Sequence, residues 1–130
     1  MSKVYWATQQ GRSIPKLKLG NLESKRDWGH AEDYVEAMWL MLQADEPNDY
    51  VVATGKTYSV EDYLKKAFQC ININEYMDHV EIDEKLLRPS EVPYLMGRST
   101  KAQQELLWTP KIHFNNLVER MVQHDIQNHG

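Results

Sequence analysis

The sequence lacks the motifs that would assign a function directly. No two of its six glycines are close enough to form a G-x-G-x-x-G dinucleotide loop, and no Walker phosphate loop is present. None of its seven tyrosines is followed by a lysine four positions later, so a Tyr-x-x-x-Lys acid–base pair is also absent. The chain therefore has no visible dinucleotide cradle and no such catalytic pair.

Cysteine and long apolar runs are scarce as well. Cys70 is the single cysteine, which excludes an internal disulfide and is typical of a reducing compartment. The longest apolar run, near residues 37–42, is far too short to span a bilayer, and the first residues show no signal-peptide pattern. We therefore expect a cytoplasmic protein that does not engage membranes.

The sequence also has no excess of positive charge. Its 15 lysines and arginines against 19 aspartates and glutamates give a net charge of −4. Nucleic-acid and membrane-surface binders need clustered basic residues, so neither kind of partner is expected. An apolar fraction of 42% and a charged fraction of 26% in 130 residues are typical of one globular domain with a modest core.

Residues able to bind metals or transfer protons are scattered. No histidine lies at ligand spacing from a cysteine or carboxylate, so no metal site is predicted. Glu32, Asp33 and Glu36 fall in the first turns of a predicted helix, where capping and solvation explain them better than catalysis. Cys70 has no evident base partner and is assigned to packing. The five histidines are His30, His79, His113, His124 and His129.

Helices outnumber strands in the secondary structure that the sequence predicts. Alternating residues predict a short strand over 16–19, and the β-branched run Tyr50–Ala53 predicts a buried strand. Ser59 and Ser99 are expected to cap helices with their hydroxyls. The predicted helices cover residues 3–10, 31–43, 59–68, 99–107 and 114–126, the last with Phe114, Leu117, Val118, Met121 and Val122 on one face.

The helix predicted over residues 31–43 is apolar on several sides. Its sequence AEDYVEAMWLMLQ contains an unbroken apolar run from Ala37 to Leu42. A helix of this kind must be covered on more than one face. The predicted strands are too few and too short to form a sheet of their own, which indicates that a partner sheet is missing.

Two arginines lie in segments that suit anion binding. Arg26 lies in KRDWGH, and Arg88 precedes Pro89 with Glu91 three residues further on. The residue before a proline is held extended, which suits a side chain that points at a ligand. Two guanidiniums suit a pyrophosphate, and a carboxylate suits ribose hydroxyls. Surface ion pairs with Asp27 or Glu91 are the alternative, and the residues alone favour it.

Four segments carry a family resemblance: LGNLESKRDWGHAEDYVEAMWLMLQADEPNDYVVATGKTYSV, IDEKLLRPSEVPYLMG, STKAQQELLWTPKIHF and LVERMVQHD. They resemble the GDP-mannose 4,6-dehydratases, which are extended short-chain dehydrogenase/reductases. The match is good over 19–130 and looser over 1–18. The resemblance implies a mostly helical α/β fragment with few short strands and no complete Rossmann sheet. Residues 1–130 would form a single partial domain, the C-terminal, GDP-sugar-binding portion.

The resemblance also implies a substrate site. The arginines of the R-D-W-G and R-P-x-E-V motifs, here Arg26 and Arg88, would hold the diphosphate of GDP-mannose or GDP. Glu91 is expected at the nucleoside ribose, and the L-G-N segment, Leu19 to Asn21, near the guanine. The glycine loop for NADP and the catalytic Thr/Ser, Glu, Tyr and Lys would precede this portion. No catalytic, cofactor-binding or metal-binding residue is therefore assigned, and NADP binding by this chain alone is not expected.

The family reaction suggests what such a portion does. These lyases convert GDP-mannose to GDP-4-keto-6-deoxymannose on the route to GDP-fucose and related deoxyhexoses. We therefore expect a truncated or split dehydratase that needs a complementary N-terminal NADP-binding chain, or that forms a homo-oligomer. The alternative is a non-catalytic nucleotide-sugar-binding or regulatory module that pairs with an intact dehydratase. A degenerate product without activity is the third possibility.

The sequence departs from the family pattern at three places. Residues 1–3 lack the arginine of a Thr-Arg-Lys run that aids NADP binding in the family. Arg98 stands where the family has aspartate, which reverses a charge near the substrate side. Leu107 stands where the family has the glycine of a Leu-Gly-Trp run. These replacements predict altered local turns.

Overall fold

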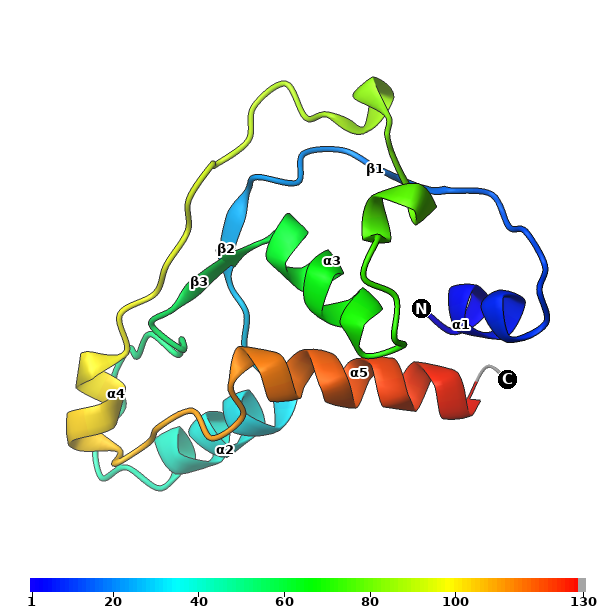
Figure 1. Cartoon of the computed structure of the whole chain (residues 1–130). Helices are drawn as coiled ribbons and strands as arrows, with labels where there is room; N and C mark the ends of the chain where they lie inside the picture. The colour runs from blue at the N-terminus through cyan, green and yellow to red at the C-terminus, as the bar shows by residue number, and fades with distance from the viewer. Residues whose placement is uncertain (129–130) are drawn as a thin grey trace. The chain divides into compact units, whose positions relative to one another are not determined.

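Helices make up most of the regular secondary structure in the computed structural model, which describes residues 1–128. The strands within these residues form two separate two-stranded sheets, β1 with β4 and β2 with β3. The predicted fold class, a mostly helical fragment without a complete Rossmann sheet, is therefore confirmed. The elements are α1 Ser2–Gln9, β1 Leu17–Leu19, β2 Lys25–Asp27, α2 Ala31–Leu42, β3 Thr57–Ser59, α3 Val60–Gln69, the 3-10 turn η1 Tyr76–His79, β4 Val80–Ile82, the 3-10 turn η2 Glu84–Leu86, α4 Thr100–Glu105 and α5 Phe114–Asn128 (Figure 1).

The chain divides into two compact units. The α3 unit comprises Met1–Ser24, Ser59–Pro93 and the residues from Val118 on, and the α2 unit comprises Lys25–Tyr58 and Tyr94–Leu117. Each unit has buried apolar residues of its own. The single partial domain expected over residues 1–130 stays a prediction.

The α3 unit is organised around a well-capped helix. The Ser59 hydroxyl accepts a hydrogen bond from Asp62 N at 3.0 Å, and the Asp62 carboxylate accepts one from Ser59 N at 2.9 Å. This reciprocal capping box confirms the predicted helix start. Leu64, Ala67 and Phe68 form the buried face of α3. The helix therefore begins because of its cap and is held by its apolar stripe.

A parallel strand pair crosses the same unit. Leu17, Lys18 and Leu19 of β1 pair with Val80, Glu81 and Ile82 of β4. The sequence predicts β1, whereas the segment 70–83 that contains β4 is ambiguous from the sequence and is consistent with a short extended connection. A three-residue strand carries almost no periodicity of its own, and β4 is defined by its pairing with residues 63 positions earlier in the chain.

The core of the α2 unit is built around a buried tryptophan. Ala37, Ala102 and Leu106 surround Trp108. The Trp108 indole N–H donates to the Asp33 carbonyl at 2.8 Å, and the Asp33 carboxylate accepts from Lys111 N at 3.0 Å and Ile112 N at 2.9 Å. Asp33 is buried, so these bonds offset the cost of removing its carboxylate from water.

The strand predicted over Tyr50–Ala53 is wrong within the described residues. The segment forms no ladder, and the Val51 side chain is 54% exposed. Strand assignment requires a hydrogen-bonding neighbour, and residues 1–128 do not supply one here. Ala53 is buried as expected. The buried strand predicted from the β-branched composition is therefore absent from the described residues, because no neighbouring strand pairs with this segment.

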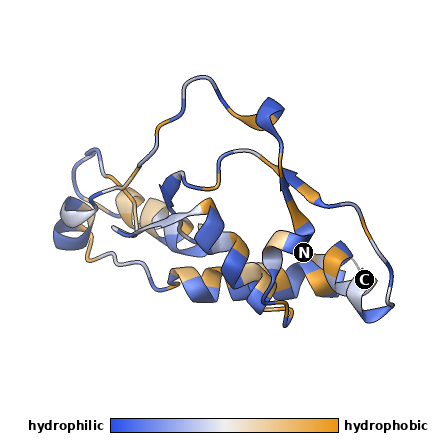
Figure 2. Ribbon diagram, turned by 45° about the horizontal axis from the view of Figure 1, so that its top comes forward, coloured by the Kyte–Doolittle hydropathy of each residue, from blue (hydrophilic) through white to orange (hydrophobic). Residues whose placement is uncertain are grey.

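Two smaller predictions also differ from the structure. Ser99 occupies the cap position of α4, yet its hydroxyl makes no cap hydrogen bond and accepts from the Gln103 side chain instead. On α5, Phe114, Leu117, Val118 and Val122 are buried, whereas Met121 is half exposed. Polar and apolar patches alternate along the ribbon of this helix (Figure 2). Among residues 1–128, no helix has the length and hydropathy required to cross a bilayer.

Leu107 adopts a left-handed backbone conformation. Its φ is +53°, and its side chain is 85% exposed, so it bears strain without gaining burial. This is the position at which the family resemblance places a glycine.

We expect Leu107→Gly to raise the free energy of unfolding by about 1 kcal/mol, because glycine adopts positive φ without a steric cost. Urea unfolding followed by circular dichroism measures the change. Leu87→Gly is the matched control, since Leu87 is also exposed but has φ −72°. It should be destabilising. Equal effects of both substitutions would contradict the strain at Leu107.

Two buried serines of the α3 unit should respond oppositely to truncation. Ser59→Ala removes the cap of α3 and should lower the free energy of unfolding by about 1 kcal/mol. The Ser24 hydroxyl is buried without a hydrogen-bond partner among the described residues, so Ser24→Ala should be neutral or stabilising. Parallel urea titrations compare the two variants. A loss at Ser24 as large as that at Ser59 would disprove the assignment.

Candidate functional site

The segment that follows β1 is fixed by its contacts with residues 83–86. Leu19, the last residue of β1, accepts a hydrogen bond on its carbonyl oxygen from Asp83 N at 2.8 Å. A Cβ atom on Gly20 would lie 2.6 Å from the carbonyl oxygen of Leu86. Only glycine therefore allows the two backbones to approach this closely. The approach sets the position of the next residue, Asn21.

Asn21 and Glu91 are joined directly. The Asn21 amide nitrogen donates to the Glu91 carboxylate at 3.0 Å, and its amide oxygen accepts from Glu23 N at 2.8 Å. The first bond links residues seventy positions apart within the α3 unit. Leu19, Asn21 and Glu91 are thus brought to one region of this unit, and the carboxylate of Glu91 is oriented by an amide.

Arg88 lies in the irregular segment between η2 and Glu91. Its side chain is exposed, and no hydrogen bond or ion pair to it is found among residues 1–128. Pro89 follows it, and the extended conformation that this proline predicts for Arg88 stays a prediction. The guanidinium of Arg88 is therefore available to an anionic ligand. Glu91 lies three positions further along the chain.

Arg26 belongs to the α2 unit, at the centre of β2. Its side chain is half-buried, and Nη1 donates to the carbonyl oxygen of Lys25 at 2.8 Å. The same carbonyl accepts from Leu95 N at 3.1 Å. The guanidinium is therefore held against its own strand in this unit.

The residues that follow Arg26 in the R-D-W-G motif support the backbone. The Asp27 carboxylate accepts from Thr54 N at 2.9 Å, Thr54 Oγ1 at 2.6 Å, Gly55 N at 2.9 Å and Gly97 N at 3.3 Å. The Trp28 indole donates to the Tyr58 carbonyl at 3.0 Å. Asp27 thus fastens three separated segments, a role that the sequence analysis did not predict. The Thr54-Gly55 pair is the sequence signal that could have indicated a turn near Asp27. In the structure Gly55 has φ +75°.

Other ionisable groups have local structural roles. The hydrogen bond from the Tyr76 hydroxyl, and then that from Lys65, lower the pKa of Glu61 below its usual value. Burial raises the pKa of the Cys70 thiol, so it stays protonated at neutral pH, which agrees with a packing role. Among residues 1–128 no cluster of three potential ligands could hold a metal ion. His129, considered with the other histidines, lies outside the described residues.

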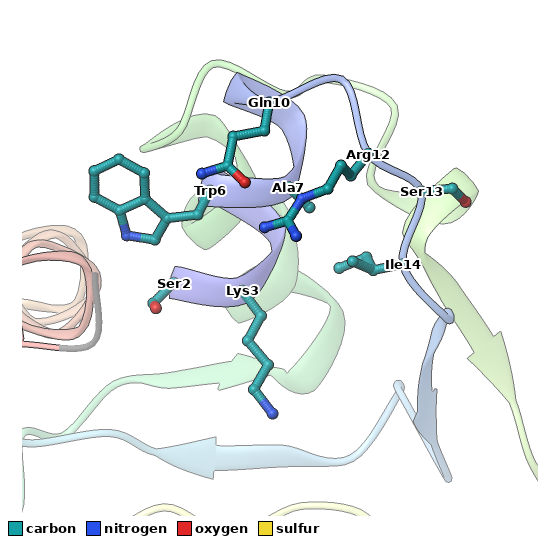
Figure 3. Close-up of a pocket in the computed structure, with 8 residues that line it drawn as sticks. All are labelled: Ser2, Lys3, Trp6, Ala7, Gln10, Arg12, Ser13 and Ile14. Atoms are coloured by element: carbon teal, nitrogen blue, oxygen red, sulfur yellow. The ribbon is translucent and has the colours of Figure 1, made fainter.

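A cavity of about 540 Å³ lies beside α1 in the α3 unit. Figure 3 shows the Arg12 guanidinium lying over α1 near Gln10, whereas the Lys3 side chain extends away from it. The two cations do not converge on one point, and none of the five predicted site residues lines the cavity. Its lining residues are Ser2, Lys3, Trp6, Ala7, Gln10, Arg12, Ser13 and Ile14.

Comparison with known proteins gives a consistent family match. A family model described as GDP-mannose 4,6 dehydratase matches residues 2–121. The GDP-mannose 4,6 dehydratase of Cricetulus griseus is 50% identical over 140 aligned residues, which cover 89% of this chain and 38% of that protein. The corresponding Homo sapiens protein is 49% identical with the same coverage. The chain therefore spans less than two fifths of the length of these relatives.

Solved structures share the fold at low sequence identity. The structure of RMD from Pseudomonas aeruginosa complexed with NADPH matches with a TM-score of 0.78 and 16% identity, over 97% of this chain and 41% of that chain. The dTDP-glucose 4,6-dehydratase of Bacillus anthracis, in complex with NAD, matches with the same TM-score and 18% identity, over 97% and 38%. More than half of each solved chain has no counterpart here.

The hydrogen bond between Asn21 and Glu91 can be measured by a double-mutant cycle. We expect Asn21→Ala and Glu91→Ala to be coupled by about 1 kcal/mol, because a charged acceptor and an amide are joined at a partly buried position. Free energies of unfolding of both single variants and the double variant give the coupling. A control cycle pairs Asn21→Ala with Glu75→Ala, and should show none. Additive effects at Glu91 would contradict the contact.

Proposed function

Because the chain belongs to the GDP-mannose 4,6-dehydratase family, we propose that it is the nucleotide-sugar-binding portion of such an enzyme. Its ligand would be GDP-mannose or GDP. The observation that carries the proposal is the contact between Asn21 and Glu91, with Arg88 exposed three residues away. These residues come from two of the motifs that carry the family resemblance.

The chemistry of these groups suits a nucleoside diphosphate. A guanidinium binds a diphosphate with two parallel charged hydrogen bonds. The side chain of Arg88, which carries such a group, is exposed to solvent. A carboxylate accepts hydrogen bonds from vicinal ribose hydroxyls, and Glu91 is already oriented by Asn21. Leu19 and Asn21 would contact the guanine side. The family resemblance assigns a diphosphate contact to Arg26 as well, and this arginine belongs to the α2 unit.

The residues of this chain do not fit a dinucleotide cofactor. A phosphate cradle requires glycines that open a helix N-terminus. Among the described residues, the two glycines with left-handed φ are Gly11 and Gly55, and the former follows α1 while the latter precedes β3. Hydride transfer would therefore need the NADP-binding portion of a family member. With that portion the chain would belong to a dehydratase of nucleotide-sugar metabolism, and without it to a non-catalytic binding module.

Calorimetric titration of the chain with GDP-mannose and GDP tests the binding. We expect Arg88→Ala to weaken binding at least about tenfold, since a charge-assisted bidentate contact is lost. Arg26→Ala should have a similar effect. Arg12→Ala is the matched control, because Arg12 is an exposed arginine of the α3 unit outside the motifs. Absence of binding at millimolar ligand, or unchanged affinity in both arginine variants, would overturn the proposal.

A turnover assay separates binding from catalysis. The chain alone, supplied with NADP and GDP-mannose, should form no GDP-4-keto-6-deoxymannose. Chromatography of the sugar nucleotides after prolonged incubation measures this. Detectable product would show that the chain itself completes the reaction, and would refute the requirement for a second portion.

A further inference from the structure

Glu61 holds two segments of the α3 unit, one with its backbone and one with its side chain. Its backbone N–H donates to the carbonyl oxygen of Leu22 at 2.9 Å. Its carboxylate oxygen Oε1 accepts a hydrogen bond from the Tyr76 hydroxyl at 2.5 Å. Leu22 directly follows Asn21, and Tyr76 begins η1, which leads into β4. One residue of α3 is therefore joined to both segments from which the candidate site is built.

The segment that carries Asn21 is attached to the first turn of α3. Next to the bond made by Glu61, the backbone N–H of Val60 donates to the carbonyl oxygen of Ser24 at 3.2 Å. The first N–H groups of a helix have no partner within that helix, so these two depend on residues 22–24 for their hydrogen bonds. Moving the segment would break both bonds. Asn21 is therefore fixed relative to the start of α3.

The second segment is attached to the same helix through η1. Lys65 Nζ lies 2.9 Å from Oε1 of Glu61, the oxygen that Tyr76 also binds, and 5.9 Å from the centroid of the Tyr76 ring. His79, the last residue of η1, stacks on Phe68 of α3 with their ring centroids 5.5 Å apart. The polar contact and the aromatic contact thus hold both ends of η1 against α3.

The pairing of β4 with β1 needs such an attachment. β4 begins directly after His79, and its ladder with β1 contains only three residue pairs. A two-stranded ladder of this length is marginal by itself, and its register is weakly specified. A slip by one residue would shift the chain that follows β4 by about 3.3 Å. The contact between Asn21 and Glu91 lies beyond the end of the ladder, so it requires the register to be kept.

We propose that Glu61 and Tyr76 are positioning residues of the nucleotide site. Neither would touch the ligand. Their hydrogen bond, together with the bond from the Glu61 backbone to Leu22, sets the distance between Asn21 and Glu91. It therefore sets the orientation of the carboxylate that would be offered to a ribose. This inference rests on the proposed function, and it adds the residues that keep the site in shape.

A purely stabilising role for the bond between Tyr76 and Glu61 makes a different prediction. A hydrogen bond at a partly exposed position contributes modestly to the stability of a protein. Its loss would lower the free energy of unfolding but leave the contact between Asn21 and Glu91 unchanged in folded molecules. A positioning role weakens that contact while the protein stays folded. A double-mutant cycle separates the two roles, because an effect shared by all its variants cancels.

The cycle of Asn21→Ala with Glu91→Ala is therefore repeated in chains that also carry Tyr76→Phe, Glu61→Ala or Glu61→Gln. In the unaltered chain we expect a coupling of about fivefold in the unfolding equilibrium constant. Tyr76→Phe removes the donor and Glu61→Ala the acceptor, so each should reduce the coupling to less than about twofold. Glu61→Gln keeps an amide oxygen that accepts the same hydrogen bond, so it should retain most of the coupling.

Tyr63→Phe is the matched control for these variants. The Tyr63 hydroxyl donates to the sulfur of Met121 at 3.5 Å, so the control removes a hydrogen-bonded hydroxyl that joins α3 to α5 instead of η1. The coupling between Asn21 and Glu91 should be unchanged in this background. Circular dichroism of each variant checks that its helix content is unchanged. Full coupling in both the Tyr76→Phe and Glu61→Ala backgrounds, or an equal loss in the control, would overturn the proposal.

Calorimetric titration with GDP adds a functional measurement. Tyr76→Phe and Glu61→Ala should each weaken GDP binding about fivefold, as is typical of residues that act through a network of contacts. Glu61→Gln and Tyr63→Phe should bind like the unaltered chain. Unchanged affinity in Tyr76→Phe and Glu61→Ala would contradict the positioning role alone. An unaltered chain that does not bind GDP would contradict the proposed function, and the couplings would then decide whether Glu61 and Tyr76 position Glu91.

Discussion

The α2 unit depends on the carboxylate of Asp27. Its two oxygens accept four hydrogen bonds, two from Thr54 and one each from Gly55 and Gly97. These donors come from segments that a two-stranded sheet of three-residue strands could not hold together. Two of the contacts also require glycine: Gly55 has a left-handed φ, and a Cβ on Gly97 would lie 2.2 Å from that of Ala53. A side-chain acceptor thus replaces the backbone ladder that is missing here.

This role changes how the R-D-W-G motif is interpreted. Asp27 and Trp28 bind backbone groups of their own unit, and Gly29 makes room for the Tyr34 ring. Three of the four motif positions therefore serve the local fold, whatever the chain binds. Their presence in the sequence is explained without any ligand. A binding role within the motif would fall to Arg26, so a test of function must separate this residue from its structural neighbours.

Local chemistry made the helices predictable, and long-range contacts made the rest unpredictable. The capping box at Ser59 and the periodicity of α3 are contained within ten residues, so the sequence alone located this helix. The pairing of β1 with β4, the contact between Asn21 and Glu91 and the bonds of Asp27 join residues far apart in the chain. Only the family resemblance, which places a glycine at position 107, suggests a left-handed conformation there, because leucine itself gives no indication of positive φ. For the candidate site, the family resemblance suggests which residues bind the ligand, but the sequence does not predict the hydrogen bonds that these residues make.

Binding and catalysis place different demands on a protein, and this chain illustrates the difference. Under the proposed function, recognition of a nucleoside diphosphate would need only a few polar and charged groups, and a small unit can position these, as Asn21 positions Glu91. Hydride transfer also needs a cofactor held against the substrate, and the doubly wound α/β folds do this with an extended parallel sheet that the described residues lack. The exposed apolar side chains of Val35, Met38, Trp39 and Leu42 belong to the α2 unit, whereas Asn21 and Glu91 belong to the α3 unit, so the two sets of residues can be altered separately.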